Sequence, residues 1–230
     1  MAGLGIQMVV FRARVFGSYN LGVYLKAAGP YLLAPPGSSS VLQEEAAGIG
    51  LRTFETSVYD SRMLGIFLAG NSRALLVPPI VSEMELRSLR EGLDLEVHVL
   101  PSVRLTALGN DIVANDYGAL VHPLFSDDEV DLIGKFLGVK AVKGRIGGVP
   151  VVGSLVVANN RGCLIAPSAD DAELRGASEV LGVQCARGTV NDGIGYIRLG
   201  LVASDSGALV GYPTTPMEIE NLAEALNIEP

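Results

Sequence analysis

Two cysteines, Cys163 and Cys185, and two histidines, His98 and His122, carry the side chains most able to do covalent chemistry. A cysteine acts as a nucleophile when a base lies within hydrogen-bond reach of it, and histidine commonly supplies that base. The sequence has no Cys-x-x-Cys pair and no cysteine–histidine cluster, so it predicts neither a disulfide framework nor a metal site. Attack by a thiolate is therefore one interpretation, and reduced, buried thiols are the other.

Two further motifs resemble ligand sites in their spacing alone. Gly188, Gly193 and Gly195 have the spacing of a phosphate loop, but no Lys-Ser/Thr pair follows them and they link two expected strands. The acidic run 127–131 has the composition of a cation site, yet acidic residues in a first helical turn are also favoured by the helix dipole. We interpret the first motif as a turn and the second as a solvated helix start.

The bulk composition predicts a soluble, cytoplasmic protein with an aliphatic core. Of 230 residues, 49% are hydrophobic and 6% aromatic. The mean hydropathy is +0.38, but the longest weakly polar stretch, 147–158, is shorter than the roughly 20 residues of a membrane span. The first ten residues lack the basic start of a signal peptide. A net charge of −8 argues against loose affinity for nucleic acid and is compatible with a basic protein partner.

One pattern recurs through the chain: an apolar strand, a short polar turn, a second apolar strand and a proline. The five copies are 21–35, 64–78, 108–123, 152–167 and 199–213. Their closing prolines are 43, 45, 44 and 46 residues apart, and a glycine is the second residue of each copy. The turns contain glycine, asparagine, aspartate and serine, the residues that tight hairpins need.

A helix and a third strand follow each hairpin. The expected capping boxes are Ser40–Gln43, Ser82–Glu85, Ser126–Glu129, Ser168–Asp171 and Thr215–Glu218. Third strands are expected at 51–59, 95–100, 139–143 and 183–189, but the fifth copy ends at Pro230 without one. A spare strand at 9–16 lies before the first hairpin, and pairing it with the fifth copy removes two sheet edges.

These elements predict a single α/β domain over 1–230, built as a closed ring of five pseudo-symmetric β-β-α-β repeats with the helices outside. The repeats cover approximately 17–59, 60–103, 104–146, 147–190 and 191–230, with strand 9–16 completing the last. An open solenoid would need a polar capping repeat at each end, and neither end has one.

The repeat sequences resemble a known family. The runs Ala-Leu-Gly-Asn at 107–110 and Asn-Asp-Tyr-Gly-Ala-Leu-Val-His-Pro at 115–123 are similar to translation initiation factor 6, the archaeal and eukaryotic ribosome anti-association factor. Val-Gly-Ser at 152–154 and Gly-Thr-Val-Asn at 188–191 also match. The approach to the first hairpin, Gly-Ser-Tyr-Asn at 17–20, departs from the family's Gly-Asn-Pro-Tyr. The chain ends with the fifth helix, so we expect an archaeal form.

The resemblance implies a pentein fold and a protein that binds the large ribosomal subunit without cofactor or catalysis. It implies contact with a basic ribosomal protein beside the sarcin–ricin loop, with minor rRNA contact, so that the small subunit cannot join. A role in large-subunit maturation is also implied, with release by a translational GTPase and a maturation factor. A monomer is expected.

The alternative comes from the same fold, because guanidine-modifying pentein enzymes use a cysteine, a histidine and acidic groups in the central cavity. His122 occupies the position before the closing proline, which other copies fill with Ala34, Val77, Ala166 and Tyr212. Cys163 lies in a second strand where other copies carry leucine or alanine. In those enzymes the nucleophile lies in the last unit, and the fifth copy here has no cysteine. Packing roles are therefore favoured.

The binding surface is predicted where each third strand meets the next hairpin. These junctions are 17–22, 60–65, 104–110, 147–154 and 191–200, and five-fold repetition places all of them at one end of the ring. Mixed apolar and polar side chains suit a protein interface. The candidate contact residues, with Asn110 first, are Asn110, Gly109, Leu108, Tyr19, Asn20, Arg62, Met63, Ser154, Leu155 and Tyr196.

Overall fold

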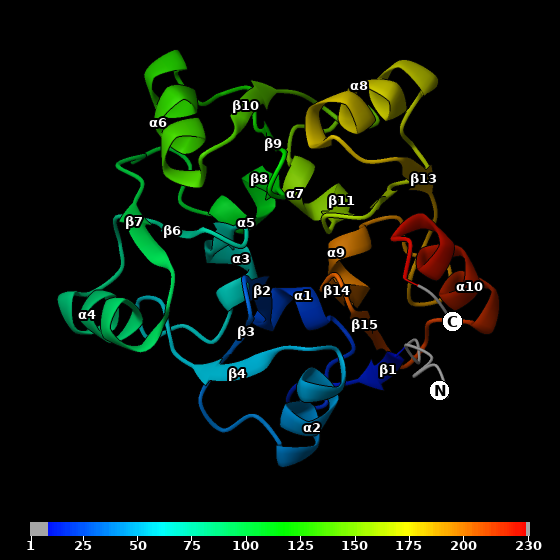
Figure 1. Cartoon of the computed structure of the whole chain (residues 1–230), viewed down its shortest axis with the longest axis horizontal. Coiled ribbons are helices and arrows are strands. Elements are labelled where there is room, and N and C mark those ends of the chain that lie inside the picture. The colour runs from blue at the N-terminus through cyan, green and yellow to red at the C-terminus, as the bar shows by residue number, and fades with distance from the viewer. Residues whose placement is uncertain (1–8, 229–230) are drawn as a thin grey trace, which may run out of the picture.

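Residues 9–228 of the computed structural model form five three-stranded sheets arranged as a ring, with the longer helices on the outside (Figure 1). The first ten residues, which lack the basic start of a signal peptide, lie mostly outside the described residues. Each sheet, together with its helices, is called a blade here and is numbered by the order of its central strand. The predicted five-fold α/β ring is confirmed.

Each blade contains the same five elements. Inner one-turn helices are α1 (Leu21–Tyr24), α3 (Leu64–Phe67), α5 (Leu108–Asp111), α7 (Val152–Leu155) and α9 (Ile197–Gly200). First strands are β2 (Lys26–Ala28), β5 (Ala69–Gly70), β8 (Ile112–Ala114), β11 (Val156–Ala158) and β14 (Leu201–Ala203). Central strands are β3 (Tyr31–Ala34), β6 (Ala74–Val77), β9 (Gly118–Val121), β12 (Cys163–Ile165) and β15 (Gly207–Gly211).

The outer layer completes each blade. Outer helices are α2 (Ser40–Gly48), α4 (Glu83–Gly92), α6 (Asp127–Leu137), α8 (Asp171–Leu181) and α10 (Pro216–Ala225). Third strands are β4 (Arg52–Glu55), β7 (Glu96–Val99), β10 (Lys140–Lys143), β13 (Cys185–Arg187) and, for the fifth blade, β1 (Val9–Ala13). In each blade the first strand pairs antiparallel and the third pairs parallel to the central strand.

The N-terminal strand closes the ring. β1 pairs in parallel with β15, from Val9 opposite Gly207 to Ala13 opposite Gly211. The prediction that strand 9–16 supplies the missing third strand is therefore confirmed, although the paired part ends at Ala13. Closure of this kind leaves neither the first nor the last blade with a missing strand.

The expected β-β-α-β order is confirmed, but the one-turn inner helices that precede it in every blade were not predicted. Close backbone packing explains them. A Cβ atom on Gly65 would lie 1.9 Å from the Gly22 carbonyl oxygen, and one on Gly109 would lie 1.9 Å from that of Gly65. Only glycine permits this approach, which lets neighbouring inner helices touch around the ring. Because these turns bury most of their side chains, their sequence looks like a buried strand.

The glycine register of the fifth copy was also predicted wrongly. α9 begins at Ile197, so Arg198 holds the second position and Gly200 the fourth. A Cβ atom on Gly22 would lie 1.8 Å from the Arg198 carbonyl oxygen, the same contact that Gly65 makes with Gly22. One blade therefore has arginine where the other four have glycine.

Three of the five predicted capping boxes are confirmed, at Ser82–Glu85, Ser126–Glu129 and Thr215–Glu218. In the first blade Ser39, and not Ser40, caps the helix by accepting a hydrogen bond from Leu42 N. In the fourth blade the box is Asp170–Glu173, and the expected Ser168–Asp171 is wrong. Asp170 with Glu173 forms a complete reciprocal pair, whereas an aspartate at the third helical position is too short to reach back.

The core is divided among the interfaces between blades. One apolar cluster joins Leu33 of β3 to Leu64, Leu75 and Leu89 of the second blade, and similar clusters lie at the other interfaces. Each blade therefore completes its neighbour's core. Within residues 9–228 no helix is long and apolar enough to cross a membrane.

Candidate functional site

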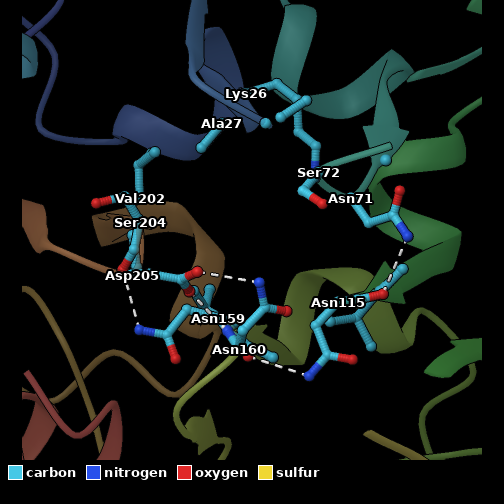
Figure 2. Close-up of a pocket in the computed structure, with 18 of the residues that line it drawn as sticks. Lys26, Ala27, Asn71, Ser72, Asn115, Asn159, Asn160, Val202, Ser204 and Asp205 are labelled. Atoms are coloured by element: carbon cyan, nitrogen blue, oxygen red, sulfur yellow. Dashed lines mark hydrogen bonds between the residues drawn. The ribbon is translucent and has the colours of Figure 1, made fainter. Parts of the chain in front are cut away.

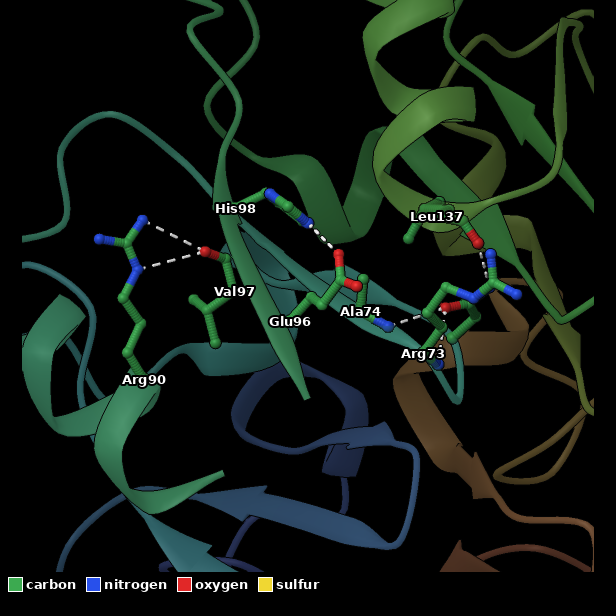
Figure 3. Close-up of polar contacts among 8 residues, drawn as sticks. Arg73, Ala74, Arg90, Glu96, Val97, His98 and Leu137 are labelled. Atoms are coloured by element: carbon green, nitrogen blue, oxygen red, sulfur yellow. Dashed lines mark hydrogen bonds and ion pairs between the residues drawn. The ribbon is translucent and has the colours of Figure 1, made fainter. Parts of the chain in front are cut away.

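The cysteines and histidines do not assemble into a nucleophile and base. Cys163 and Cys185 lie opposite each other in β12 and β13, are buried in an apolar cluster, and burial raises the pKa of the Cys163 thiol. His98 stacks on Phe136. Its Nε2 lies 2.9 Å from Glu96 Oε2, a contact that Figure 3 shows. Among the described residues neither thiol has a hydrogen bond to a histidine.

His122 has a structural role. Its Nδ1 accepts a hydrogen bond from Leu124 N, and burial, with the nearby Arg145, lowers its pKa. Strand pairing makes Val121 equivalent to Val77, so His122 is equivalent to Pro78 and not to Val77. The alignment by closing prolines was therefore wrong by one residue at this position. The register is set by the hydrogen-bonded strands and not by the proline.

The inner helices contact one another around the ring, so the junctions that lead into them lie next to one another. We call the five junctions the junction rim. In four of them the chain reverses through a tight turn closed by a two-residue bridge, as between Val58 and Ser61. All central residues of these turns have positive φ, including Phe16 at 51°, Tyr59 at 54° and Asp60 at 55°. Bulky residues at positive φ cost about 1–2 kcal/mol each, and such strain is concentrated at functional sites.

Capping glutamates of the outer helices hold these turns. Glu85 accepts hydrogen bonds from Tyr59 N at 3.0 Å, Asp60 N at 3.1 Å and Ser57 Oγ at 2.6 Å. Glu173 accepts from the amides of the fourth turn and Glu218 from those of the fifth. The same side chains that start the helices therefore fix the shape of the rim.

Replacing Glu85 with glutamine should destabilise the protein by about 1–2 kcal/mol at pH 7. Partial burial alone would raise the pKa of Glu85, but hydrogen bonds from Ser57, Ser82 and Asp60 outweigh it and lower this pKa to about 2. A pKa below its unfolded value gives stability that is present above about pH 4.5 and is lost as pH falls through about 2. The predicted loss is smaller than the full pKa shift implies, because the carboxylate is only half-buried and solvent screens it.

Urea unfolding of wild type and Glu85→Gln at pH 7 and pH 3 measures this effect. The difference between the two proteins should shrink at the lower pH. Glu83→Gln, in the same helical turn but outside the rim contacts, is the matched control and should change little. Equal losses for the two variants would contradict the assigned role.

Exposed aromatic rings and arginines gather where the first blade meets its neighbours on the rim. The Arg62 guanidinium lies 4.8 Å from the Phe16 ring centroid, and that of Arg14 lies 5.9 Å from the Tyr212 ring. Tyr19 and Tyr212 have ring centroids 6.4 Å apart. We call these five residues the aromatic patch. Such cation–π pairs preorganise side chains that remain open to a partner.

The predicted contact residues divide into three groups. Tyr19, Asn20, Arg62, Met63 and Tyr196 are exposed. Asn110 and Ser154 are half-buried at the third position of α5 and α7. Leu108, Gly109 and Leu155 are buried, so their prediction as contact residues is wrong, because the helical turn directs them inward.

Sequence reasoning missed Phe16, Tyr59 and Tyr212, which are 45%, 71% and 50% exposed. An available signal was the pairing of a bulky aromatic with glycine or aspartate at Phe16-Gly17 and Tyr59-Asp60, between a strand and a buried turn. Aromatic residues at such turns have no core to fill.

A second candidate site, separate from the aromatic patch, lies at the centre of the ring. First strands and hairpin turns from all five blades surround a cavity of about 130 Å³ (Figure 2). Lys26, Val202, Asn115, Asn160 and Asp205 are among the side chains around it.

The hairpin turns are joined by side chains that cross from blade to blade. Asn115 Nδ2 donates to the carbonyls of Asn159, at 3.0 Å, and Leu181, at 2.7 Å, both in the next blade. Asn71 of the second blade and Asn159 of the fourth each donate in the same way to two carbonyls of the following blade. Ser204 of the fifth blade donates to Ile49 O of the first. Figure 3 shows Leu137, Arg73 and Ala74, whose backbone groups bond to Asn71. We call Asn71, Asn115, Asn159 and Ser204 the asparagine belt.

The first blade lacks this link. Ala28 holds the equivalent position, and the turn contacts the second blade through a backbone bond from Gly29 N to Asn71 O at 3.1 Å. Four of the five interfaces are therefore joined by a belt side chain.

The chain is similar to translation factors along nearly its whole length. The eIF-6 family model matches residues 10–225. Translation initiation factor 6 of Saccharolobus solfataricus is 40% identical over 218 residues, covering 94% of this chain and 97% of that protein. That of Nitrosopumilus maritimus is 40% identical over 219 residues, covering 95% and 99%. That of Aeropyrum pernix is 38% identical over 226 residues, covering 96% and 97%.

Among solved structures, the N-terminal domain of ArgZ, a cyanobacterial arginine dihydrolase, matches with a TM-score of 0.49 and 14% identity, over 75% of this chain and 70% of that one. This likeness is too distant to carry an argument. The sequence matches do carry an argument, because the family model and the archaeal relatives match nearly the same residues, and these residues include every blade. The chain belongs to the eIF-6 family.

Proposed function

We propose that this translation factor binds the large ribosomal subunit by its junction rim and sterically prevents the small subunit from joining. The relatives' shared name supports a role in translation initiation. The observation that carries the proposal is the rim itself, where exposed aromatic and arginine side chains stand on strained turns fixed by glutamates. No nucleophile–base pair is assembled in the described residues, which supports a binding protein over an enzyme.

The composition of the rim supports its use as an interface. Tyrosine, phenylalanine, methionine and arginine are enriched in the centres of protein interfaces. Tyr19, Tyr59, Met63 and Tyr196 are each more than 40% exposed on the rim, although large apolar side chains are normally buried. Because Glu85, Glu173 and Glu218 already order the turns, binding would lose little conformational entropy.

Charge refines the expected partners. The net charge of −8 favours a basic ribosomal protein as the main contact. Arg14 and Arg62 of the aromatic patch instead suit phosphate groups, so we infer that ribosomal RNA meets the rim there. Two kinds of partner can share one face because the arginines lie together at the first blade.

Co-sedimentation with purified ribosomal subunits tests the proposal. The protein should sediment with large subunits and not with small ones, and should saturate at one molecule per large subunit. The yield of joined ribosomes should fall as its concentration rises, without added nucleotide, because the block is steric. Failure to bind large subunits at low-micromolar concentration would remove the proposed function.

A pair of variants tests the choice of face. Asn110→Arg should weaken binding at least about tenfold, a loss of about 1.4 kcal/mol, because a long charged side chain replaces a half-buried amide on the rim. Arg87→Glu, on the exposed surface of α4, should leave binding unchanged. If Arg87→Glu proves as damaging as Asn110→Arg, the partner stands but the face does not.

A further inference from the structure

Two cations break the five-fold pattern of the central cavity. Lys26 lies in β2, and Arg198 lies in α9, and both line the cavity. The residues equivalent to Lys26 in the other blades are Ala69, Val113, Val157 and Val202. The residues equivalent to Arg198 are Gly22, Gly65, Gly109 and Gly153. The fold therefore does not need a cation at either position.

The two side chains approach each other from neighbouring blades. A Cβ atom on Gly22 would lie 2.8 Å from Arg198 Cγ, so the arginine side chain runs along α1. α1 leads directly into β2, which carries Lys26. Burial, with the positive charge of Arg198, holds the pKa of Lys26 well below its usual value.

Neither cation has a counter-ion among residues 9–228. The salt bridges of the described residues lie elsewhere, and Arg198 Nε is buried without a hydrogen-bond partner. The carboxylates that line the cavity, Asp116 and Asp205, are engaged at the hairpin turns. Asp116 accepts from Ser72 N at 2.9 Å, and Asp205 accepts from Asn160 N at 2.7 Å. Both cations are half-buried, and a buried N–H group without a partner, such as Arg198 Nε, is destabilising, so such groups are normally hydrogen-bonded.

We propose that the central cavity binds a free oxyanion of the size of phosphate or sulfate between Arg198 and Lys26. The planar guanidinium can donate two parallel hydrogen bonds to an oxyanion, and the lysine adds a compact positive charge. The cavity volume of about 130 Å³ leaves room for an ion of this size. The site lies between the blades and reaches the hairpin turns, so it does not depend on the proposed ribosome contact.

Thermal unfolding with phosphate, and with sodium chloride at equal ionic strength, tests the proposal. Phosphate at about one hundred times its dissociation constant should raise the wild-type midpoint by about 5 °C more than chloride does. Adenosine monophosphate should give no such rise, which separates a free oxyanion from a phosphate carried by a larger molecule. Isothermal titration calorimetry with phosphate should give one site per chain.

The chain's own repeats supply the variants. Lys26→Ala copies the second blade and Arg198→Gly copies the other inner helices, so each should fold and lose the phosphate response. Without phosphate, Arg198→Gly should unfold at a higher temperature than wild type, because a half-buried charge with an unpartnered Nε–H is removed. Arg87→Ala, on the exposed face of α4, should keep the full response.

Several outcomes would overturn the proposal. These are equal responses to phosphate and chloride in wild type, an unchanged response in both cavity variants, or an equal response to adenosine monophosphate. If Arg198→Gly does not fold, Lys26→Ala and the wild-type comparison still decide. Binding of Lys26→Ala to large subunits should be unchanged, because Lys26 lies in β2 and outside the junction rim, so failure here leaves the proposed function in place.

Discussion

Asn115→Ala should lower the free energy of unfolding by about 3–5 kcal/mol, a large loss for one polar side chain. The Asn115 amide is buried and uses its whole hydrogen-bonding capacity. Nδ2 donates to Asn159 O and Leu181 O, and Oδ1 accepts from Tyr117 N at 3.0 Å and Gly118 N at 3.1 Å. Alanine would leave these four backbone groups without that partner, and each unsatisfied buried group costs about 1–3 kcal/mol.

Asn110→Ala is the matched control, because it makes the same chemical change in the same blade. Asn110 is half-buried, and its side chain has no hydrogen bond within residues 9–228, so its loss should stay within about 0.5 kcal/mol. Urea denaturation followed by circular dichroism measures both variants. Similar losses for Asn110→Ala and Asn115→Ala would show that the belt does not join the blades.

The ring could be predicted because its elements recur and because a missing strand at one end matched a spare strand at the other. The inner helices could not. A four-residue buried turn and a four-residue buried strand both consist of apolar residues and glycine, and only the packing of Gly65 against Gly22 distinguishes them. Leu108 and Leu155 were expected to contact a partner because they lie in the junctions, but the helical turn buries both side chains.

The long-range polar contacts of the asparagine belt could not be predicted from the sequence for a different reason. Asparagine in a hairpin turn is explained by turn geometry alone, so Asn115 gave no sign of a second role. Its partner Asn159 lies 44 residues away, as Asn71 does in the other direction. This spacing equals the repeat length, and a polar residue recurring at that period in buried turns was the signal available. In the fifth copy, Gly200 was aligned with the second-position glycines of the other copies, so Arg198 was not recognised as the residue at that position.

Tyr59→Gly should reduce affinity for the large subunit about 30-fold while leaving the free energy of unfolding within about 1 kcal/mol of wild type. Tyr59 has φ 54° and is 71% exposed, so its backbone is strained and its ring fills no core. Glycine adopts this conformation without strain, and the relief offsets the entropy that glycine adds to the unfolded chain. The bonds to Glu85 use backbone amides and survive the change. A loss of about 2 kcal/mol in binding is typical of a central aromatic contact.

Tyr117→Ala separates the rim from exposed aromatics in general. Tyr117 is 57% exposed on the hairpin turn between β8 and β9, at the opposite end of the ring from the junctions, and its removal should not change binding. Sedimentation titrations of both variants, with urea denaturation alongside, give affinity and stability on the same samples. Because Tyr59→Gly should leave the protein folded, a loss of binding by this variant would come from the rim surface and not from unfolding. If Tyr117→Ala weakens binding and Tyr59→Gly does not, the ribosome-facing surface is the hairpin end, and the strain at Tyr59 serves some other purpose.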